Sequence, residues 1–338
     1  MSLQDLSCPK CGAPIPPQSR RGAIYCAFCC TALIWSQDSF QIAPSYPADN
    51  LVESWRPRFW LAGHRYRVLG RLALGESADA FLALRDHRLT ERVIAKCLRA
   101  DEDRDLFAAE WATLQALQDS SAPGAEHFTR LLPQPVAQGQ ARLGVRGKEG
   151  ERTMLVYGFA SGFVHTFADA RRHYAHGIPA AAAVWLWKRI LELASFIHSS
   201  GYVHGALLPR HLLIHARDHG VRFCGFGSTV RIGRPLLAFP AADSAFNSAA
   251  GAAAQAVGPS HDITTSARSI LWLLGGDVRS APATTPAPLA ALLERAAQPD
   301  AGGLSTAWAV REELDEAARQ AFGPPRFIPF PLPGWNFN

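Results

Sequence analysis

Residues 204–214 read HGALLPRHLLI, and the prediction of the fold rests mainly on this stretch. It follows a strongly amphipathic segment, 180–198, whose apolar residues recur at helical spacing. A second stretch, VRFCGFG at 221–227, comes shortly after it. Both stretches are rich in apolar residues and contain no carboxylate, so neither supplies an acidic base or an acidic metal ligand.

The two stretches resemble the catalytic loop, H-R-D-L-K-P-x-N-x-L-L, and the D-F-G segment of the protein kinase family. At the positions that carry chemistry in that family, this chain has different residues. The resemblance places Ala206 at the base aspartate, His211 at the metal-binding asparagine and Gly225 at the magnesium aspartate. Gly205 and Leu208 stand at the arginine and the lysine. Because phosphoryl transfer depends on positioning and on metal and charge stabilisation, the resemblance implies a pseudokinase.

Three further residues resemble parts of a kinase nucleotide site. Gly75 lies in LALGESADAFLA (72–83), at the middle glycine of the G-x-G-x-x-G loop. Lys96 ends VIAK (93–96) like the phosphate-binding lysine, and Glu110 lies on the buried side of the next predicted helix, like its partner glutamate. The resemblance makes Gly75, Lys96 and Glu110 a vestigial nucleotide site, in which tight Mg-ATP binding is not expected. A purely structural ion pair between Lys96 and Glu110 is an equal alternative.

The first 35 residues contain two Cys-x-x-Cys turns, Cys8 to Cys11 and Cys26 to Cys29. Two such turns supply the four thiolates that zinc prefers, and Cys30 is an alternative to Cys29 as a ligand. A unit of this size buries too little surface to fold alone, whereas structural zinc contributes about 10–16 kcal/mol. The sequence therefore predicts a structural Zn²⁺ in a zinc ribbon.

Short strand-like runs surround one helical segment in the first half of the remaining chain, and helices follow. The runs cover 67–74, 80–84, 92–98, 136–145 and 153–157, around a helix at 105–117, and later helices are predicted at 180–198, 262–274, 288–297 and 305–322. Asp262 resembles the structural aspartate that holds the kinase catalytic loop. The predicted fold class is α+β, a bilobal protein kinase-like fold with a five-stranded N-lobe, one N-lobe helix and a mainly helical C-lobe, preceded by a small four-cysteine zinc ribbon.

Composition shifts divide the chain into five parts. They are a zinc ribbon (1–35), a linker (36–63), a kinase-like N-lobe (64–158), a kinase-like C-lobe (159–322) and a Pro/aromatic tail (323–338). The tail carries Phe327, Phe330, Trp335 and Phe337, which expose too much apolar area for a free terminus. We expect it to lie ordered, either on the C-lobe or in the groove of a partner.

Composition excludes several function classes. The 338 residues are 48% apolar and 19% charged, with a net charge of +5. No basic block favours nucleic acid or an anionic membrane, and the predicted ribbon offers only Lys10, Arg20 and Arg21 as cations. No secretory signal stands at the N-terminus, and charges interrupt the longest apolar stretch, 179–196. We therefore expect a cytoplasmic protein with no membrane or nucleic-acid partner.

The favoured function is a pseudokinase that binds another protein as a scaffold or allosteric regulator. The alternative is an atypical kinase-fold phosphoryl or nucleotidyl transferase that uses Lys96 and Glu110, with His211 as a further candidate. A third is a nucleic-acid-binding module that acts through the zinc ribbon.

Overall fold

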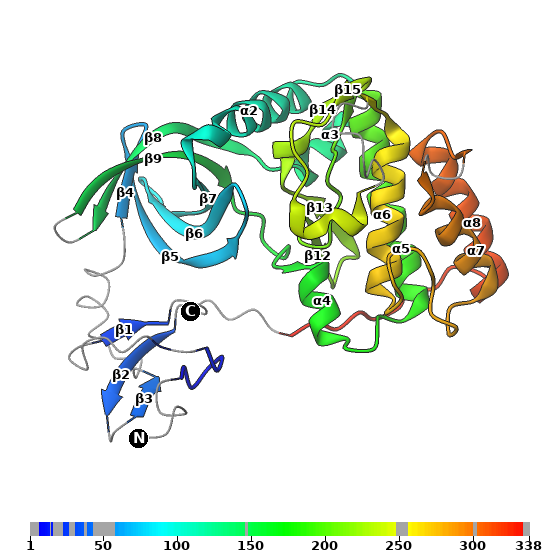
Figure 1. Ribbon diagram of the computed structural model, residues 1–338, viewed down its shortest axis with the longest axis horizontal. Helices are drawn as coiled ribbons and strands as arrows, with labels where there is room; N and C mark the ends of the chain where they lie inside the picture. Colours follow the sequence, from blue (N-terminus) through cyan, green and yellow to red (C-terminus); the bar gives the residue numbers. More distant parts are fainter. Residues whose placement is uncertain are drawn as a thin grey trace. The chain divides into compact units, whose positions relative to one another are not determined.

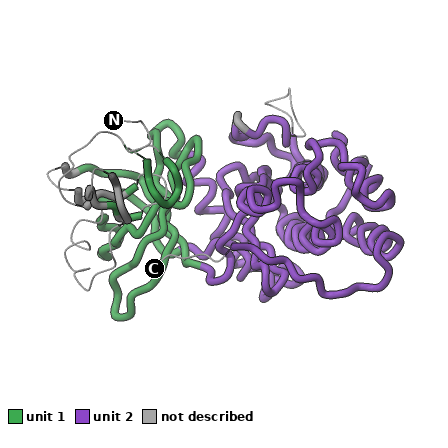
Figure 2. Tube along the Cα trace, turned by 90° about the horizontal axis from the view of Figure 1, so that it is seen from below, with its two compact units in different colours: residues 1–104, 136–159 green, residues 105–135, 160–338 purple. Residues whose placement is uncertain are grey.

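The computed structural model describes residues 7–13, 15, 23–26, 31–36, 39–42, 58–145, 148–247, 256–299 and 303–333. The chain forms two compact units, which Figure 2 shows in two colours: residues 1–104 with 136–159, and residues 105–135 with 160–338. The predicted N-lobe helix thus belongs to the second unit. Among the described helices, none combines the length and the apolar character needed to cross a membrane.

The N-terminal part contains a three-stranded antiparallel sheet. Its strands are β1 (Ala23–Tyr25), β2 (Ala32–Ser36) and β3 (Ser39–Ile42), in the order β1-β2-β3. Cys8, Ile15, Cys26 and Leu33 form its small buried core. We call the described residues between 7 and 42 the N-terminal module. Strand β3 lies in the stretch expected to be a linker.

The rest of the first unit is a closed six-stranded antiparallel barrel (Figure 1). Its strands are β4 (Arg58–Leu61), β5 (His64–Leu74), β6 (Ala78–Asp86), β7 (Glu91–Leu98), β8 (Pro135–Val145) and β9 (Lys148–Gly158). The strand order is β4-β5-β6-β7-β9-β8, and β4 closes the ring because it pairs with both β5 and β8. The rings of Phe59 and Tyr66 stack in its core with centroids 4.6 Å apart.

The barrel shows that the predicted fold class is wrong. The prediction gave a five-stranded N-lobe of a bilobal kinase-like fold, whereas six strands close on themselves here. The sixth strand, β4, escaped prediction because it has four residues, directly follows Pro57, and pairs on one side with residues 142–144, far along the chain. Small sheets in the second unit also depart from the mainly helical C-lobe that was expected.

The second unit consists of helices and three small sheets. The helices are α2 (Arg104–Gln118), α3 (Ala125–Phe128), α4 (Phe167–His173), α5 (Ala180–Ser199), α6 (Pro259–Leu273), α7 (Ala287–Ala296) and α8 (Ala307–Phe322). The sheets pair β10 (His165–Thr166), β12 (Leu212–His215) and β13 (Gly220–Phe223); β11 (Tyr202–Val203) and β14 (Val230–Arg231); and β15 (Arg234–Pro235) and β16 (Ala256–Val257). The five predicted helices are confirmed to within a few residues. The buried face of α5 carries Trp187 and Ile190, so the unit's core forms on it.

Residues 323–333 lie extended along the second unit, as Figure 1 shows in red beneath α4 and α5. Three side chains of the unit bond to its backbone carbonyls: His165 to Pro333 at 2.8 Å, Tyr174 to Pro331 at 2.9 Å and His219 to Ile328 at 2.8 Å. The described part of the tail is therefore ordered on this chain itself. Trp335 and Phe337 lie outside the described residues.

Aromatic rings fix the same segment. Phe327 stacks on His219 with centroids 4.3 Å apart, and His219 stacks on Trp185 at 4.2 Å. Phe330 packs edge-on against Trp185 and stacks on Tyr174 at 5.3 Å. Phe330 is 4% exposed and Phe327 is 69% exposed, so Phe330 is the main apolar anchor of the tail.

We expect Phe330→Ala to lower the free energy of unfolding of the second unit by about 2–3 kcal/mol. This is less than a core Phe→Ala change usually costs, because the tail can detach without global unfolding. Trypsin should also cleave faster after Arg326. Denaturant unfolding and a digestion time course measure the two effects.

The matched control is Phe327→Ala, which removes a mostly exposed ring from the same segment. We expect a stability change within about 1 kcal/mol for it. If Phe330→Ala changed neither stability nor cleavage, the packing seen here would not contribute to the stability of the unit.

Candidate metal centre and the 204–227 loops

Three cysteines cluster in the N-terminal module. The sulfur atoms of Cys8, Cys11 and Cys26 all lie within 4.8 Å of one another, and those of Cys11 and Cys26 are 3.6 Å apart. This separation is far too long for a disulfide bond. It agrees with the spacing of about 3.8 Å between two thiolates on a tetrahedral ion with bonds of about 2.3 Å. The cluster therefore has the geometry of a metal site.

Short backbone turns hold these cysteines in place. The N–H of Cys8 donates to the carbonyl of Ala13 at 2.8 Å, and the N–H of Gly12 donates to that of Cys8 at 2.8 Å. The N–H of Cys26 donates to the carbonyl of Thr31 at 2.9 Å, just before β2. Two of the four predicted ligands come from the first turn and one from the second. The fourth, Cys29, and its alternative, Cys30, lie outside the described residues.

Asp262, on the first turn of α6, organises the loop that follows β11. It is completely buried, and its two carboxylate oxygens accept the backbone N–H groups of His204 and Gly205, both at 2.8 Å. The Nε2 atom of His198 bonds to the same carboxylate at 3.0 Å. Burial raises the pKa of Asp262, but the bond from His198 and the nearby histidines outweigh it, so the pKa lies below its ordinary value. Asp262 therefore holds the loop backbone, as predicted.

His204 is a buried, neutral histidine with a defined tautomer. Its Nε2–H donates to the carbonyl of Cys224 at 3.1 Å, while its Nδ1 accepts the N–H of Ala206 at 3.3 Å. Burial lowers the pKa of His204 to about 4, against the opposing charge of Asp262. A proton on Nδ1 would face the N–H of Ala206, so the bond between them requires the neutral ring. At neutral pH the ring therefore links two loops and does not exchange protons.

His211 occupies the space next to Gly225. Its Nδ1–H donates to the carbonyl of Ala206 at 2.8 Å. A Cβ atom added at Gly225 would lie 2.6 Å from the His211 ring, and Gly225 has a φ of +78°, which L side chains rarely adopt. A carboxylate at position 225 therefore requires both a moved His211 and a strained backbone. The His211 ring has room beside position 225 because residue 225 is a glycine.

The remaining predicted site residues lie in different units. Glu110 is 2% exposed on α2, and a Cβ atom at Gly227 would lie 3.4 Å from its Oε2 atom, so its carboxylate borders the 225–227 segment. Lys96 lies in β7, paired with Leu155, and Gly75 forms the turn between β5 and β6, both in the first unit.

The backbone of Gly75 is already used within its own turn. Its N–H donates to the carbonyl of Ala78 at 2.9 Å, and its carbonyl accepts from the Arg99 guanidinium at 2.8 Å. In a phosphate-binding loop, the backbone N–H groups bind the ligand. At this turn the N–H of Gly75 serves to close the hairpin.

Sequence reasoning missed two histidines of the loop network. His198 binds Asp262, and the Nε2 of His261 bonds to the carbonyl of Gly205 at 3.0 Å. His198 ends one predicted helix and His261 directly precedes another, but no spacing rule connects either histidine to residue 204. Among the described residues, the Cys8, Cys11 and Cys26 cluster is the one group of three or more possible ligands close enough to share an ion.

No protein-family model matches this chain, and no curated protein matches it.

Proposed function

We propose that this chain is a catalytically inactive homologue of protein kinases, a pseudokinase, that acts by binding another protein. The proposal rests on the motif residues and not on the predicted five-stranded fold, which the barrel overturns. One observation carries it. Ala206, His211 and Gly225 stand at the positions where kinases hold their base and metal ligands. His211 bonds to the carbonyl of Ala206, and its ring fills the space that a side chain at position 225 would need.

The loop network supports a structural role for this region. Asp262, His204 and His261 satisfy the backbone of residues 204–206, and each of these side chains is buried. A buried polar network of this kind holds a loop in one conformation. The side chains that would bind Mg²⁺ are absent from the sequence at these positions. The arrangement therefore favours a structural role for these loops over a catalytic one.

The same proposal assigns Zn²⁺ to the N-terminal module, as a structural ion. Three converging thiolates and a second Cys-x-x-Cys turn fit zinc better than the hard cations, which prefer oxygen ligands. The metal would be held by Cys8, Cys11 and Cys26, with Cys29 as the fourth ligand. Its role is to fold a module whose own core contains few residues.

The described part of the tail packs on this chain, with Phe330 buried, so it is not offered to a partner. Under this proposal the partner binds the N-terminal module. Nucleic acid is disfavoured there, because few cations occur in the predicted ribbon.

The melting temperature of the full chain, measured with ATP in the presence and absence of Mg²⁺, tests the proposal. We expect no magnesium-dependent rise in melting temperature and no phosphoryl transfer to protein substrates, because both metal ligands of the kinase pattern are replaced. Lys96→Ala should leave capture of a partner unchanged.

A magnesium-dependent shift in the wild-type protein that Lys96→Ala abolishes would overturn the proposal and restore the enzyme alternative. The triple variant Ala206→Asp, His211→Asn, Gly225→Asp is the positive comparison. If that variant gains magnesium-dependent ATP binding while the wild type has none, the replaced residues account for the loss.

A further inference from the structure

The strand pairing of the barrel gathers arginines that are far apart in the sequence. Phe59 and Tyr66 stack inside the barrel, so the residues next to them on β4 and β5 point outward. The same alternation turns the residues next to Ala141 on β8 and Val93 on β7 outward, because both lie in the core. Six of the outward residues form a surface that we call the basic face: Arg58, Trp60, Arg65, Arg67, Arg92 and Arg142.

One row of the basic face places a tryptophan between two arginines. Trp60 on β4 lies directly opposite Arg65 on β5 and Arg142 on β8. The guanidinium carbon of Arg142 lies over the indole ring, 5.1 Å from its centroid, and Trp60 is partly exposed. Arg65 and Arg142 are both exposed. This row therefore presents a flat ring flanked by cations, a combination that proteins use to bind single-stranded nucleic acids.

The neighbouring row sets like charges against each other. Arg58 on β4 lies directly opposite Arg67 on β5, and Leu84 on β6 separates Arg67 from the exposed Arg92 on β7. Like charges at directly opposite positions of an antiparallel pair destabilise a sheet. An anion that binds between the two side chains relieves this repulsion, so the row favours a negatively charged partner.

The two rows contain one carboxylate. Asp86 on β6 lies opposite Arg65, and its oxygens accept hydrogen bonds from the Nε atoms of Arg65 at 2.5 Å and Arg67 at 3.3 Å. Five arginines and one aspartate give the two rows a net charge of +4, whereas the whole chain carries +5. Positive charge is therefore concentrated on this face, although the sequence contains no basic block.

The side chains of the basic face fit single-stranded nucleic acid better than other polyanions. Guanidinium groups bind phosphate oxygens in pairs and stack on flat rings, and every cation of the two rows is an arginine. Trp60 adds a ring on which a base can stack, and a bilayer surface has no bases. A flexible single strand can follow the curved outside of a barrel, whereas a duplex is stiff.

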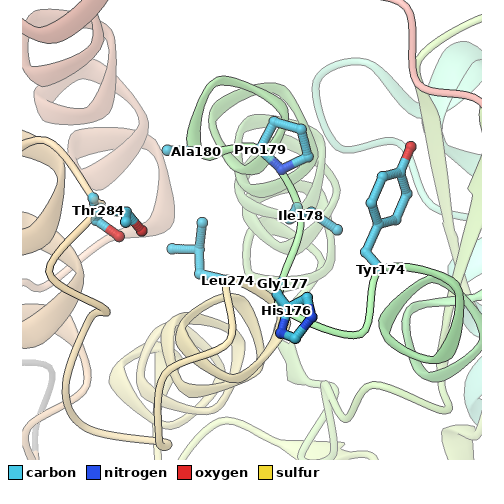
Figure 3. Close-up of a pocket in the computed structure, with 9 residues that line it drawn as sticks. Tyr174, His176, Gly177, Ile178, Pro179, Ala180, Leu274 and Thr284 are labelled. Carbon is cyan, nitrogen blue, oxygen red and sulfur yellow. The ribbon is translucent and has the colours of Figure 1, made fainter.

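The pocket of the second unit lacks these features. It has a volume of about 330 Å³ and lies where the segment between α4 and α5 meets the segment between α6 and α7 (Figure 3). Among the described residues that line it, none is an arginine or a lysine. A phosphate group would therefore meet no permanently charged cation there, and the basic face is the more favourable site for a polyanion.

We propose that the basic face binds single-stranded nucleic acid. The phosphates bind to the arginines, and a base stacks on Trp60 and the guanidinium of Arg142. The basic face belongs to the first unit and the 204–227 loops belong to the second, so this inference does not rest on the proposed function. It replaces the expectation from composition that the chain has no nucleic-acid partner.

Fluorescence anisotropy of the full chain with a labelled oligothymidylate of about ten nucleotides tests the proposal. We expect a Kd of about 1–100 µM at physiological salt, the range of binding that depends mainly on phosphate contacts. The plot of log Kd against log salt should reveal about four phosphate contacts. Its slope should have a magnitude of about 3, because each contact with a single strand contributes about 0.7.

The double variant Arg65→Gln, Arg142→Gln removes two exposed cations of the basic face. It should weaken binding at least about tenfold and reduce the magnitude of the salt slope by about 1.4. The double variant Arg217→Gln, Arg319→Gln is the matched control. It removes the same charge from two exposed arginines of the second unit, and it should bind within about twofold of the wild type.

Two single variants separate charge from stacking. Asp86→Asn releases Arg65 and Arg67 from their carboxylate and should tighten binding about threefold, a gain that loss of folding cannot produce. Trp60→Leu keeps every charge and should weaken binding at least about fivefold with the salt slope unchanged. The melting temperature of each variant, measured without nucleic acid, shows whether the barrel has stayed folded.

Several results would overturn the proposal. They are the absence of binding even at low salt, equal losses in the two double variants, and weaker binding in Asp86→Asn. Tighter binding to phosphatidylserine vesicles than to the oligonucleotide would assign the face to a membrane surface. Equal affinity for inorganic polyphosphate and for the oligonucleotide, in both the wild type and Trp60→Leu, would mean that the face attracts any polyanion and does not recognise bases.

Discussion

Replacing Cys11 by serine in the full chain is expected to release the metal and unfold the N-terminal module, while the barrel and the second unit stay folded. The module's core is formed by few residues, two of which are the cysteines Cys8 and Cys26. Structural zinc contributes about 10–16 kcal/mol to modules of this kind, and the loss of one of its thiolates removes most of that contribution. Apolar burial on this scale cannot replace it.

Elemental analysis and hydrogen exchange measure this outcome. The wild-type protein, purified without chelator, should carry about one zinc per chain, and the variant less than about a tenth of that. The N–H of Cys26, which is bonded to the carbonyl of Thr31, should lose its protection from exchange. Protection in α5 should not change, because that helix has its own core.

Cys97→Ser is the matched control. Cys97 lies in β7, outside the cluster, and burial raises the pKa of its thiol, which disfavours the thiolate that a metal needs. This variant should keep its zinc and its protected module. Wild-type zinc content in Cys11→Ser, or wild-type protein with less than about a tenth of an equivalent, would contradict the assignment.

Local pattern was enough to predict the helices and one buried carboxylate. Segment 180–198 repeats apolar residues at helical spacing, and the structure has α5 at Ala180–Ser199. Glu110 was predicted on the buried side of its helix and is 2% exposed. These features depend on neighbours three or four residues apart, so a single sequence contains their signal.

Pairings between distant residues could not be predicted in the same way. Strand β4 has too few residues to show a period, and its pairing with β8 turns an expected open sheet into a barrel. The tail was expected to be ordered, but its aromatic partners, Trp185 and His219, lie far back in the chain. In each case tertiary contacts, and not local propensity, decide the outcome.

The role of Asp262 lies between these two cases. A motif predicted its contact with the loop backbone, and the structure adds contacts that the motif did not predict. The motif indicated a carboxylate that holds the loop backbone, and the structure shows both of its oxygens accepting backbone N–H groups. His198 and His261 were not predicted, since they meet the loop only after α5 and α6 have packed.

We expect Asp262→Ala to lower the free energy of unfolding of the second unit by about 3–5 kcal/mol. The change leaves the N–H groups of His204 and Gly205 and the Nε2 of His198 without their acceptor. Because Asp262 is completely buried, water cannot take its place without opening the loop. Denaturant unfolding followed by tryptophan fluorescence, to which the buried Trp187 contributes, measures the loss.

A graded series keeps this prediction testable if Asp262→Ala does not fold. His198→Ala removes one of the three bonds and should cost about 1–2 kcal/mol, while Asp262→Asn keeps one acceptor oxygen and should fall between the two. Asp218→Ala is the control, because Asp218 is exposed and pairs with Arg217 at the surface, so the change should stay within about 0.5 kcal/mol. Equal stability of the Asp262 variants and the control would mean that the carboxylate does not hold the loop. The order His198→Ala, Asp262→Asn, Asp262→Ala follows from the number of hydrogen bonds lost, and a different order would require another account of this network.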